Sequence, residues 1–477
     1  MGGSYGDENP IAAFATTPGK SALTLIRCSG KGAIELAAGI FSKPEKLLNA
    51  GGNTVVHGWI AAFDEKIDET LVSVFRAPKS YTGEDSLDIS CHGGGAAGGG
   101  VMNALREAGF RDALPGEFTF RAFMNGKLDL TRSESVMELV SARTGKGRRH
   151  AVNRLSGALQ DEINAIKKTL ATVLSGAEMF LDYSEDEIGA DPEEAAGRLP
   201  GKPLAEEALV RLKNLASSWR RERIYQEGIP AAIAGRPNAG KSSLFNLLLK
   251  EERSIVSEIP GTTRDWIEAW ISIEGVPIRL LDTAGLRDSG DPVEKIGVER
   301  SRRLLEEAEL VLYLIDGAEG LTGEDRVFLD DFEKAGGGNE CTPPSRQILI
   351  LWNKADLAPM PESLSLAAER PISVSAKTGK GIPELVRAIA GALANTADFT
   401  AFDNPQSAAL GSVRQKNLVE AAVAALEEAL YLADREEPLD LIAPLLREAL
   451  NSLGEITGEI STADILEEMF SRFCVGK

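Results

Sequence analysis

The sequence predicts a protein of the α/β plus all-α class with roughly three domains. The first observation is its length, because 477 residues suffice for about three domains at about 100–200 residues each. The second is its composition, since a hydrophobic fraction of 43% and a charged fraction of 26% are typical of globular proteins. The third is a change of hydrophobic pattern near residues 127, 226 and 396, which separates strand-rich, helical and alternating segments.

Residues 1–127 are expected to form an N-terminal α/β domain. Short runs typical of strands, TVVHGWIAAF, LVSVF and SLDISCHGG, alternate there with glycine-rich turns. One short run, VMNALREAG, has the pattern of a helix. Strands mixed with a helix at this length predict a small domain with its own core.

Residues 128–226 and 397–477 are expected to be helical. Apolar residues recur there at helical spacing, which gives each segment a continuous apolar face. The first stripe comprises Val152, Leu155, Leu159, Ile163, Ile166, Leu170 and Val173. The later stripes comprise Val419, Val423, Leu426 and Leu430, and then Leu439, Ile442, Leu446, Leu450 and Leu453.

Residues 227–396 alternate β-branched strands with helices, which predicts a second α/β domain. Its position between two helical segments indicates an insertion into one helical domain, a tolerated arrangement when the ends of the insert lie close together. The alternative is two separate helical domains. We favour the single domain, because each helical half is short for an independent core.

Membrane and secretory proteins are not favoured by this sequence. No stretch approaches the about 18 continuous apolar residues that a membrane span needs. The beginning, MGGSYGDENP, lacks the basic-then-apolar layout of a secretory signal. We therefore expect a cytoplasmic protein that does not associate with membranes.

The cysteines and histidines do not predict a zinc site or a disulfide framework. The four cysteines are far apart and include no C-x-x-C pair, and only three histidines accompany them. These residues are Cys28, Cys91, Cys341, Cys474, His57, His92 and His150. Cys91 and Cys341 are interpreted as structural thiols.

The net charge of −20 argues against a broad nucleic-acid surface, since phosphate contacts need Lys and Arg. A local basic patch stays open in the run SARTGKGRRHAVNRL. Its basic residues are Arg143, Lys146, Arg148, Arg149 and Arg154. The simpler interpretation of this run is a solvated helix start.

A phosphate-binding loop is predicted in IPAAIAGRPNAGKSSLFNLLL. Gly235 and Gly240 bracket four residues ahead of Lys241 and Ser242, which gives G-x-x-x-x-G-K-S between a strand and a helix. Backbone N–H groups of such a loop cradle phosphates, the lysine reaches the β- and γ-oxygens, and the serine ligates Mg²⁺.

Four further motifs follow in order: GTTRD (261–265), DTAG (282–285), NKAD (353–356) and SAK (375–377). The carboxylate of Asp356 suits the N1 and N2 groups of guanine, so NKAD favours GTP over ATP. Order, spacing and placement after strands resemble the GTPase superfamily. The residues expected at the nucleotide are Asn238, Ala239, Gly240, Lys241, Ser242, Ser243, Ser257, Glu258, Ile259, Pro260, Gly261, Thr262, Thr263, Asp282, Thr283, Ala284, Gly285, Asn353, Lys354, Asp356, Ser375, Ala376 and Lys377.

The residue after DTAG departs from Ras-like GTPases. Leu286 stands where those proteins carry the glutamine that orients the attacking water. A leucine cannot polarise water, so another group has to act. Glu294 could accept a hydrogen bond from the water, and Asn238 could help to hold a monovalent cation against the phosphates. On these residues alone, a solvated carboxylate at a helix start is an equal alternative for Glu294.

Several longer segments resemble the bacterial tRNA-modification GTPase family MnmE, also called TrmE. They are SYTGEDSLDISCHGG (80–94), PGEFTFRAFMNGKLDLTRSESVMELV (115–140), GRPNAGKSSLFN, GTTRD, DTAGLR with VEKIG, EITGE (455–459) and the terminal FCVGK. The resemblance covers nearly the whole chain. It implies an N-terminal folate-binding and dimerisation domain, a helical domain and an inserted Ras-like GTPase domain.

The resemblance also implies the chemistry. Members of the family act with a flavoprotein, MnmG (GidA), which carries FAD, to add an aminomethyl or carboxymethylaminomethyl group to C5 of the wobble uridine of certain tRNAs. The carbon comes from a tetrahydrofolate, in the 5-formyl or 5,10-methylene form. GTP hydrolysis depends on K⁺ and on the approach of the two GTPase domains of a homodimer.

Individual residues receive roles from the same resemblance. Mg²⁺ is assigned to Ser242 and Thr263, and K⁺ to Asn238, Ser257, Ile259 and Thr262. Glu294 becomes the carboxylate that orients water. The folate residues are Arg27, Asp88, Lys127 and Lys477, where Asp88 replaces the usual glutamate of the family.

The last stretch, FCVGK, is not a prenylation signal, because its final residue is lysine. The resemblance implies that this tail folds back to the folate pocket, with Cys474 near the transferred carbon as a candidate catalytic residue. The alternative function for the whole chain is a GTP-switched ribosome-assembly or RNA-binding factor without modification chemistry.

Overall fold

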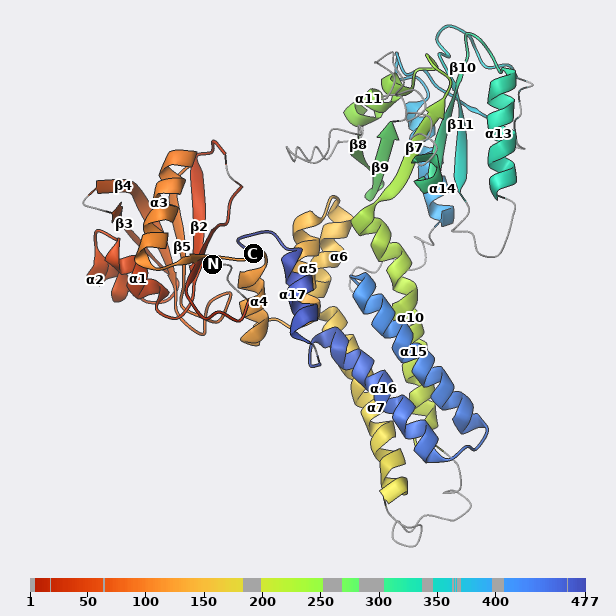
Figure 1. Cartoon of the computed structure of the whole chain (residues 1–477). Coiled ribbons are helices and arrows are strands. Elements are labelled where there is room, and N and C mark those ends of the chain that lie inside the picture. The colour runs from red at the N-terminus through yellow and green to blue at the C-terminus, as the bar shows by residue number, and fades with distance from the viewer. Residues whose placement is uncertain are drawn as a thin grey trace, which may run out of the picture. The chain divides into compact units, whose positions relative to one another are not determined.

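The computed structural model describes residues 5–17, 19–62, 65–182, 199–251, 268–282, 304–336, 346–362, 364, 366, 370–396, 407–460 and 462–477 (Figure 1). The chain forms two compact units. The first comprises Met1–Met137, Arg154–Lys213 and Val413–Lys477, and the second comprises Glu138–Asn153 and Asn214–Ser412. The expected boundaries near 127, 226 and 396 stay predictions.

The first unit begins with a six-stranded sheet in the order β3-β4-β5-β2-β1-β6. Its neighbouring strands run antiparallel, except β1 and β6, which are parallel. The strands are β1 (Ile11–Phe14), β2 (Leu23–Ser29), β3 (Thr54–Ala62), β4 (Glu65–Phe75), β5 (Ser86–His92) and β6 (Arg111–Asp112). The accompanying helices are α1 (Ala33–Gly39), α2 (Pro44–Leu48), α3 (Gly95–Ala108) and α4 (Glu117–Met124).

The core of this sheet lies on the face that α1 and α3 cover. Alternate residues of β4 and β5, such as Val72 and Ile89, pack there with Ile34 and Leu105 of the helices. Such alternation is what half-buried strands show. Cys91 belongs to the same core, and burial raises the pKa of its thiol to about 11.

Helix α3 begins earlier than its apolar pattern predicts. It starts at Gly95, inside the glycine run that precedes the predicted helical run VMNALREAG. Glycine is a weak helix former, so tertiary packing decides here. A Cβ at Gly98 would lie 3.3 Å from Phe14 and Thr24, and one at Gly100 would lie 2.7 Å from Ile67. The missing side chains therefore let α3 lie close against the sheet.

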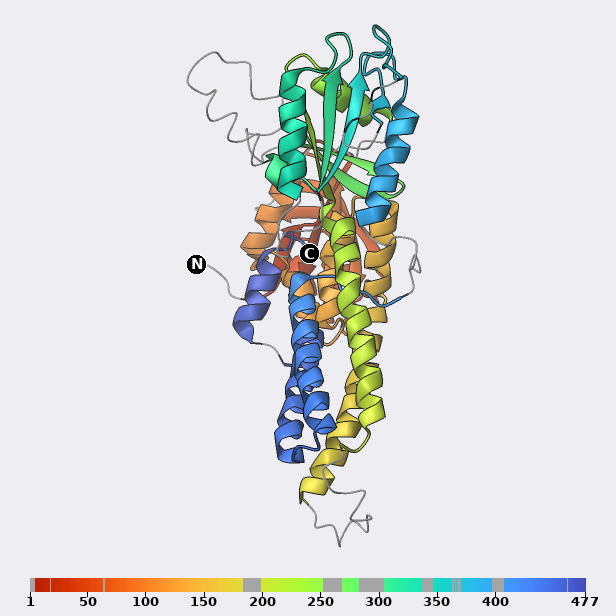
Figure 2. The same cartoon turned by 90° about the vertical axis from the view of Figure 1, so that its right-hand side faces the viewer.

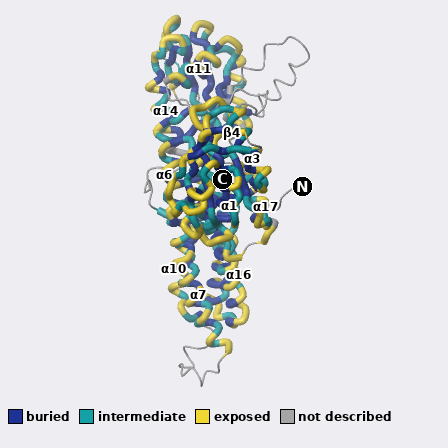
Figure 3. The backbone as a smooth tube through the Cα atoms, turned by 90° about the vertical axis from the view of Figure 1, so that its left-hand side faces the viewer, coloured by how far each residue is buried: buried dark blue, intermediate teal, exposed yellow. Residues whose placement is uncertain are grey.

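Six of the described helices form most of the helical part of the first unit. They are α5 (Leu130–Ser141), α7 (Ala158–Asp182), α10 (Lys202–Glu227), α15 (Val413–Asp434), α16 (Leu439–Thr457) and α17 (Ala463–Ser471). Helix α16 packs against both α15 and α7, which lie side by side with it in Figures 1 and 2. Buried and exposed residues alternate along α7, α10 and α16, as Figure 3 shows. No helix among the described residues is long and apolar enough to span a membrane.

The first predicted stripe is wrong at its beginning. Val152 and Leu155 lie on a separate helix, α6 (Gly145–Leu155), and Val152 is exposed. The chain turns at Gly157, whose φ of 108° ends the run before α7 begins. From Leu159 to Val173 the stripe is buried as predicted. Spacing alone could not reveal the break, because a turn of suitable length preserves the apolar period.

The second unit contains a six-stranded sheet in the order β12-β11-β10-β7-β9-β8. All neighbouring strands are parallel except β8 and β9. The strands are β7 (Ile229–Gly235), β8 (Glu268–Ile273), β9 (Val276–Asp282), β10 (Leu310–Asp316), β11 (Gln347–Asn353) and β12 (Ile372–Ser373). The helices are α11 (Lys241–Glu251), α13 (Gly323–Gly336) and α14 (Ile382–Thr396).

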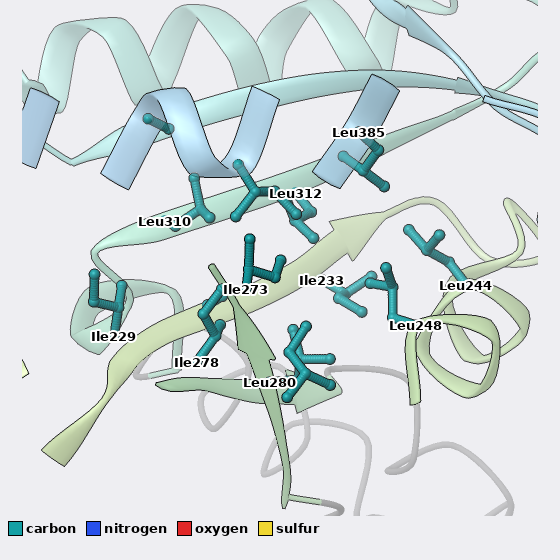
Figure 4. Packing of buried hydrophobic residues seen from close by; sticks show 14 of the residues in the cluster. Ile229, Ile233, Leu244, Leu248, Ile273, Ile278, Leu280, Leu310, Leu312 and Leu385 are labelled. Carbon is teal, nitrogen blue, oxygen red and sulfur yellow. The ribbon is translucent and has the colours of Figure 1, made fainter. Parts of the chain in front are cut away.

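Both faces of this sheet are covered, which explains its nearly continuous apolar strands. On one face Leu244 and Leu248 of α11 and Leu385 of α14 pack against Ile233 and Leu312 (Figure 4). On the other face α13 contributes to a second core around β10 and β11. Because β7 and β10 lie at the centre of the sheet, the loops at their carboxyl ends start from paired strands. The observed folds confirm the expected α/β plus all-α class.

Candidate functional site

The glycine loop of the second unit connects the central strand β7 to α11. Gly235 ends the strand with φ 136°, and a Cβ there would overlap the carbonyl oxygen of Leu314. Gly240 has φ 99°, and a Cβ there would overlap Nδ2 of Asn353. Only glycine meets both conditions without strain. The loop and the first turn of α11 line a cavity of about 760 Å³.

The polar residues of this loop line the same cavity. Lys241 Nζ donates to the carbonyl oxygens of Gly235 at 2.9 Å and Arg236 at 2.8 Å. Ser242 and Ser243 are exposed in the first turn of α11, whose backbone N–H groups carry the positive end of the helix dipole. Ala239 is buried, whereas Asn238 is exposed and has a left-handed φ of 62°. An anion is the ligand that this arrangement suits.

The carboxyl end of β11 contacts the glycine loop through Asn353, the last residue of the strand. Its side chain is buried, and Nδ2 donates to the carbonyl oxygen of Ala239 at 2.6 Å. Its Oδ1 accepts from the backbone N–H of Ala376 at 3.0 Å. Asn353 therefore ties the glycine loop to the SAK segment, although these segments are far apart in the sequence.

Asp356 is exposed and lies beside the SAK segment. Its Oδ1 accepts a hydrogen bond from the Ser375 hydroxyl at 2.6 Å, which lowers the pKa of Asp356. Lys377, in the same segment, is exposed. An ionised, exposed carboxylate at this position can accept hydrogen bonds from paired N–H groups of a base.

Asp316 is a residue of this site that the sequence analysis missed. It ends β10 and is buried, and its Oδ2 pairs with Lys354 Nζ at 2.5 Å. Burial opposes its ionisation, but hydrogen bonds from Lys354 and Ala318 outweigh burial and lower the pKa of Asp316. The signal was a lone carboxylate at the end of the apolar run LVLYLID, where the carboxyl ends of parallel strands meet.

Eleven of the expected residues fall within 252–267 and 283–303, which lie outside the described residues. These are Ser257, Glu258, Ile259, Pro260, Gly261, Thr262, Thr263, Thr283, Ala284, Gly285 and Glu294. Asp282 is the last residue of β9, where its backbone pairs with Ile233 of β7. The DTAG motif therefore starts at the carboxyl end of a strand next to β7.

In the first unit, Arg27 and Asp88 face each other across β2 and β5. The guanidinium binds the carboxylate with two hydrogen bonds, from Nε at 3.0 Å and Nη2 at 3.3 Å. The Arg27 guanidinium also lies 5.8 Å from the centre of the Tyr81 ring. Their expected roles are separate contacts to a folate, whereas in this structure the two side chains bind each other.

Helix α4 connects this pair to Lys127 and to the tail. The Tyr81 hydroxyl and the Thr119 hydroxyl of α4 are 2.9 Å apart. Lys127 Nζ donates to the Pro78 carbonyl oxygen at 3.0 Å, in the loop that also carries Tyr81. All four folate candidates therefore lie on β2, β5, α4 and the segments that adjoin them.

The tail lies against the beginning of α4. The backbone N–H of Gly116 donates to the Cys474 carbonyl oxygen, and that of Phe118 donates to Lys477, both at 3.2 Å. Phe470 and Phe473 anchor the tail in a small apolar core with Leu130. The Cys474 side chain is exposed.

A buried ionic network supports the same helix, and sequence reasoning missed it. Glu117 is fully buried, and its carboxylate accepts hydrogen bonds from Arg111 at 2.5 Å and from Arg121 at 3.0 Å. Arg121 also binds Glu84 at 3.2 Å. No motif predicts these pairs, because a charged residue in a helix is usually solvated.

The chain matches two family models along most of its length. A model described as "GTP-binding protein TrmE N-terminus" matches residues 10–127, and one described as "MnmE helical domain" matches residues 130–474. Among solved structures, the G domain of the T. maritima FeoB iron transporter is 26% identical and covers 35% of this chain and 98% of that chain. Its TM-score is 0.25, which supports no further argument.

Curated relatives cover the whole chain. A protein of Treponema denticola named "tRNA modification GTPase MnmE" is 43% identical over 100% of this chain and 99% of its own length. Proteins of the same name from Borrelia turicatae and Streptococcus thermophilus are each 39% identical, over 100% and 98% of this chain and the same shares of their own length. By sequence and domain content, this chain belongs to the MnmE (TrmE) family.

Proposed function

We infer that this chain is a GTP-hydrolysing enzyme of tRNA modification. The observation that carries the inference is the junction at Asn353, which brings the glycine loop and the SAK segment together in a chain of the MnmE family. The glycine loop suits phosphates, and Asp356 suits the N1 and N2 groups of guanine. One nucleotide can therefore be bound at its phosphates by the glycine loop and at its base by Asp356.

Mg²⁺ is proposed to bind beside the phosphates, with Ser242 and Thr263 as its protein ligands. Ser242 supports this role because it is exposed in the first turn of α11. In the nucleotide complex, Lys241 would leave the carbonyl oxygens that it now binds and contact the β- and γ-phosphates. The bound Mg²⁺ supplies positive charge to the transferring phosphoryl group.

K⁺ is proposed to bind near the same phosphates through Asn238, Ser257, Ile259 and Thr262. The exposed Asn238, with its left-handed backbone, supports this role because it lines the cavity at the glycine loop. Glu294 is proposed to orient the attacking water in place of the glutamine that Leu286 replaces. A carboxylate can accept a hydrogen bond from water, whereas a leucine side chain cannot.

A tetrahydrofolate is proposed to bind around Arg27, Asp88, Lys127 and Lys477. Arginine and lysine suit the glutamyl carboxylates, and an acidic residue suits the N–H edge of the pterin. The Arg27–Asp88 pair supports this proposal because the two side chains remain 28% and 20% exposed, so each can exchange its contact for a ligand.

A homodimer is proposed to form through the sheet face opposite α1 and α3. Exposed apolar side chains support this, with Leu23 61%, Val55 61% and Leu71 50% exposed. The strand registers place Leu71 opposite His57 and Ser90, and Asp88 opposite Ser73 and Arg27. Arg27 and Asp88 therefore share this face with Leu71. Exposed apolar side chains rimmed by polar residues are typical of an interface.

The proposed product is a wobble uridine with an aminomethyl or carboxymethylaminomethyl group at C5. The flavoprotein MnmG, with its FAD, is the proposed partner for the redox step, and Cys474 is the proposed catalytic thiol. Its exposed position on a tail anchored at α4 supports this role. The tail would bring the thiol to the pocket that holds the one-carbon donor.

Mass spectrometry of wobble uridines tests the proposed function. Cells that lack the protein should lose the C5-modified nucleosides and regain them with the wild-type chain. Cys474→Ser should hydrolyse GTP at the wild-type rate but restore no modification. Unchanged nucleosides in the deletion strain would refute the function, and full restoration by Cys474→Ser would refute the role of the thiol.

A further inference from the structure

We propose that the solvent face of α6, with Arg148 and Arg149, is a docking surface for the phosphate backbone of tRNA. The proposal rests on the proposed function, which makes tRNA the substrate. The sequence left two interpretations of this basic run, a local basic patch for phosphates and a solvated helix start. The proposal selects the first.

The structure divides the basic run into two faces. His150 is buried, and its Nδ1 lies 2.7 Å from Oε1 of the buried Glu222 in α10. Arg154 is also buried. Arg148 and Arg149 are exposed, as is Val152 one turn later. Two guanidinium groups therefore remain on the solvent side of a helix whose other side is packed.

The position of these cations within α6 is unfavourable for the helix itself. Lys146, Arg148 and Arg149 lie within its first five residues, and its first turn has no acidic residue. Cations at the positive amino end of a helix are destabilising, whereas anions there are stabilising. A solvated helix start would gain from acidic residues at this position, and a bound polyanion would reverse the unfavourable charge.

The sequence around α6 is also positively charged. Residues 139–160 contain no Asp or Glu, although the whole chain has 72 of them and a net charge of −20. A polyanion is repelled by most of such a chain, so its approach depends on a local region of positive charge. Arginine also suits phosphate because its planar fork can donate two hydrogen bonds to one group.

The beginning of α6 contacts the sheet of the second unit. The Arg143 guanidinium, just before α6, lies 3.8 Å from the centre of the Trp270 ring on β8. In the adjoining turn, a Cβ at Gly275 would lie 3.0 Å from the Lys146 side chain, so the two segments are in close contact. A docking surface on α6 would therefore keep a fixed position on the sheet that binds the nucleotide.

The test measures binding of an unmodified tRNA transcript with a wobble uridine to the full-length protein at several NaCl concentrations. The variant is Arg148→Glu/Arg149→Glu. The matched control is Arg326→Glu/Lys334→Glu, which reverses two exposed cations on α13 of the same unit. Thermal unfolding and GTP hydrolysis are measured on all three proteins.

We expect the α6 variant to bind tRNA at least about tenfold more weakly, because it loses two charge-assisted contacts. The slope of log affinity against log salt should become shallower by roughly 1.5, since each lost phosphate contact contributes about 0.7–0.9. Its unfolding temperature should not fall, because glutamates suit the amino end of a helix. The α13 control should bind tRNA like the wild type.

Unchanged affinity and slope in the α6 variant would overturn the docking surface and leave the proposed function intact. An equal loss in the α13 control would also overturn it, because it would show a general effect of net charge. Failure of the wild-type protein to bind tRNA would instead contradict the proposed substrate, and the docking surface with it.

Discussion

The nucleotide region and the region of the folate candidates are held together in different ways. In the nucleotide region, every described candidate lies at or after the carboxyl end of a parallel strand, and backbone geometry at Gly235 and Gly240 shapes the loop. In the first unit, the folate candidates Arg27 and Asp88 come from antiparallel strands, whereas Lys127 follows α4 and Lys477 lies in the tail. A buried ionic network around Glu117 supports that helix. Local chain geometry therefore dominates one site, and long-range side-chain contacts dominate the other.

The largest expected effect tests the nucleotide region at Glu294. Glu294→Ala should slow single-turnover GTP hydrolysis in K⁺ by roughly 10²–10⁴-fold, because it removes the group that orients the water. Wild-type hydrolysis should be faster in K⁺ than in Na⁺. The control is Glu384→Ala, an exposed carboxylate on α14 that should leave the rate unchanged. Full activity of Glu294→Ala, with no preference for K⁺, would contradict this mechanism.

The next effect tests the ionic network of the N-terminal domain. Glu117→Gln should lower the free energy of opening around α4 by about 3–5 kcal/mol, because it leaves Arg111 and Arg121 without their buried carboxylate. Hydrogen exchange of the α4 backbone measures this change locally, which suits a chain of several domains.

Glu69→Gln is the matched control for this prediction. Glu69 pairs with His57 on the surface of the same sheet, where both side chains are about half exposed. Exposed pairs contribute about 0–1 kcal/mol, so the control should exchange almost like the wild type. Equal protection of the α4 amides in both variants would show that the buried network does not stabilise α4.

The smallest effect tests whether Arg27 is available to a ligand. Arg27→Ala should weaken binding of 5-formyltetrahydrofolate by about tenfold, since a charge-assisted hydrogen bond contributes about 1.5–3 kcal/mol. Equilibrium titration measures the affinity. Arg106→Ala is the control, because Arg106 forms a similar two-bonded pair with Asp112 on the surface of the same domain.

The folate titration also decides between the two functions proposed from the sequence. A GTP-switched ribosome-assembly or RNA-binding factor has no reason to bind folate. If the wild-type protein failed to bind 5-formyltetrahydrofolate, the modification chemistry would lose its one-carbon donor. If Arg27→Ala bound like the wild type, Arg27 would be a structural partner of Asp88 only.

The apolar pattern predicted the fold class and many of the helices, with instructive exceptions. Leu159 to Val173 are buried as their spacing predicts, whereas Val152 is exposed because the helix breaks at Gly157. Helix α3 extends into a glycine run against local propensity, since glycines let it approach the sheet. Periodicity reports which side chains could share a face, and packing decides whether they do.

The sequence by itself determined the parts of this protein that depend on neighbouring residues. The strand, glycine loop and helix around Lys241 follow from local geometry, so their motif could be recognised without the fold. Only the tertiary structure decided which distant groups meet. Examples are the Arg27–Asp88 pair, the Asp316–Lys354 pair and the stacking of Arg143 on Trp270. These contacts join residues far apart in the chain, and burial and complementary charge, which spacing does not encode, select the partners.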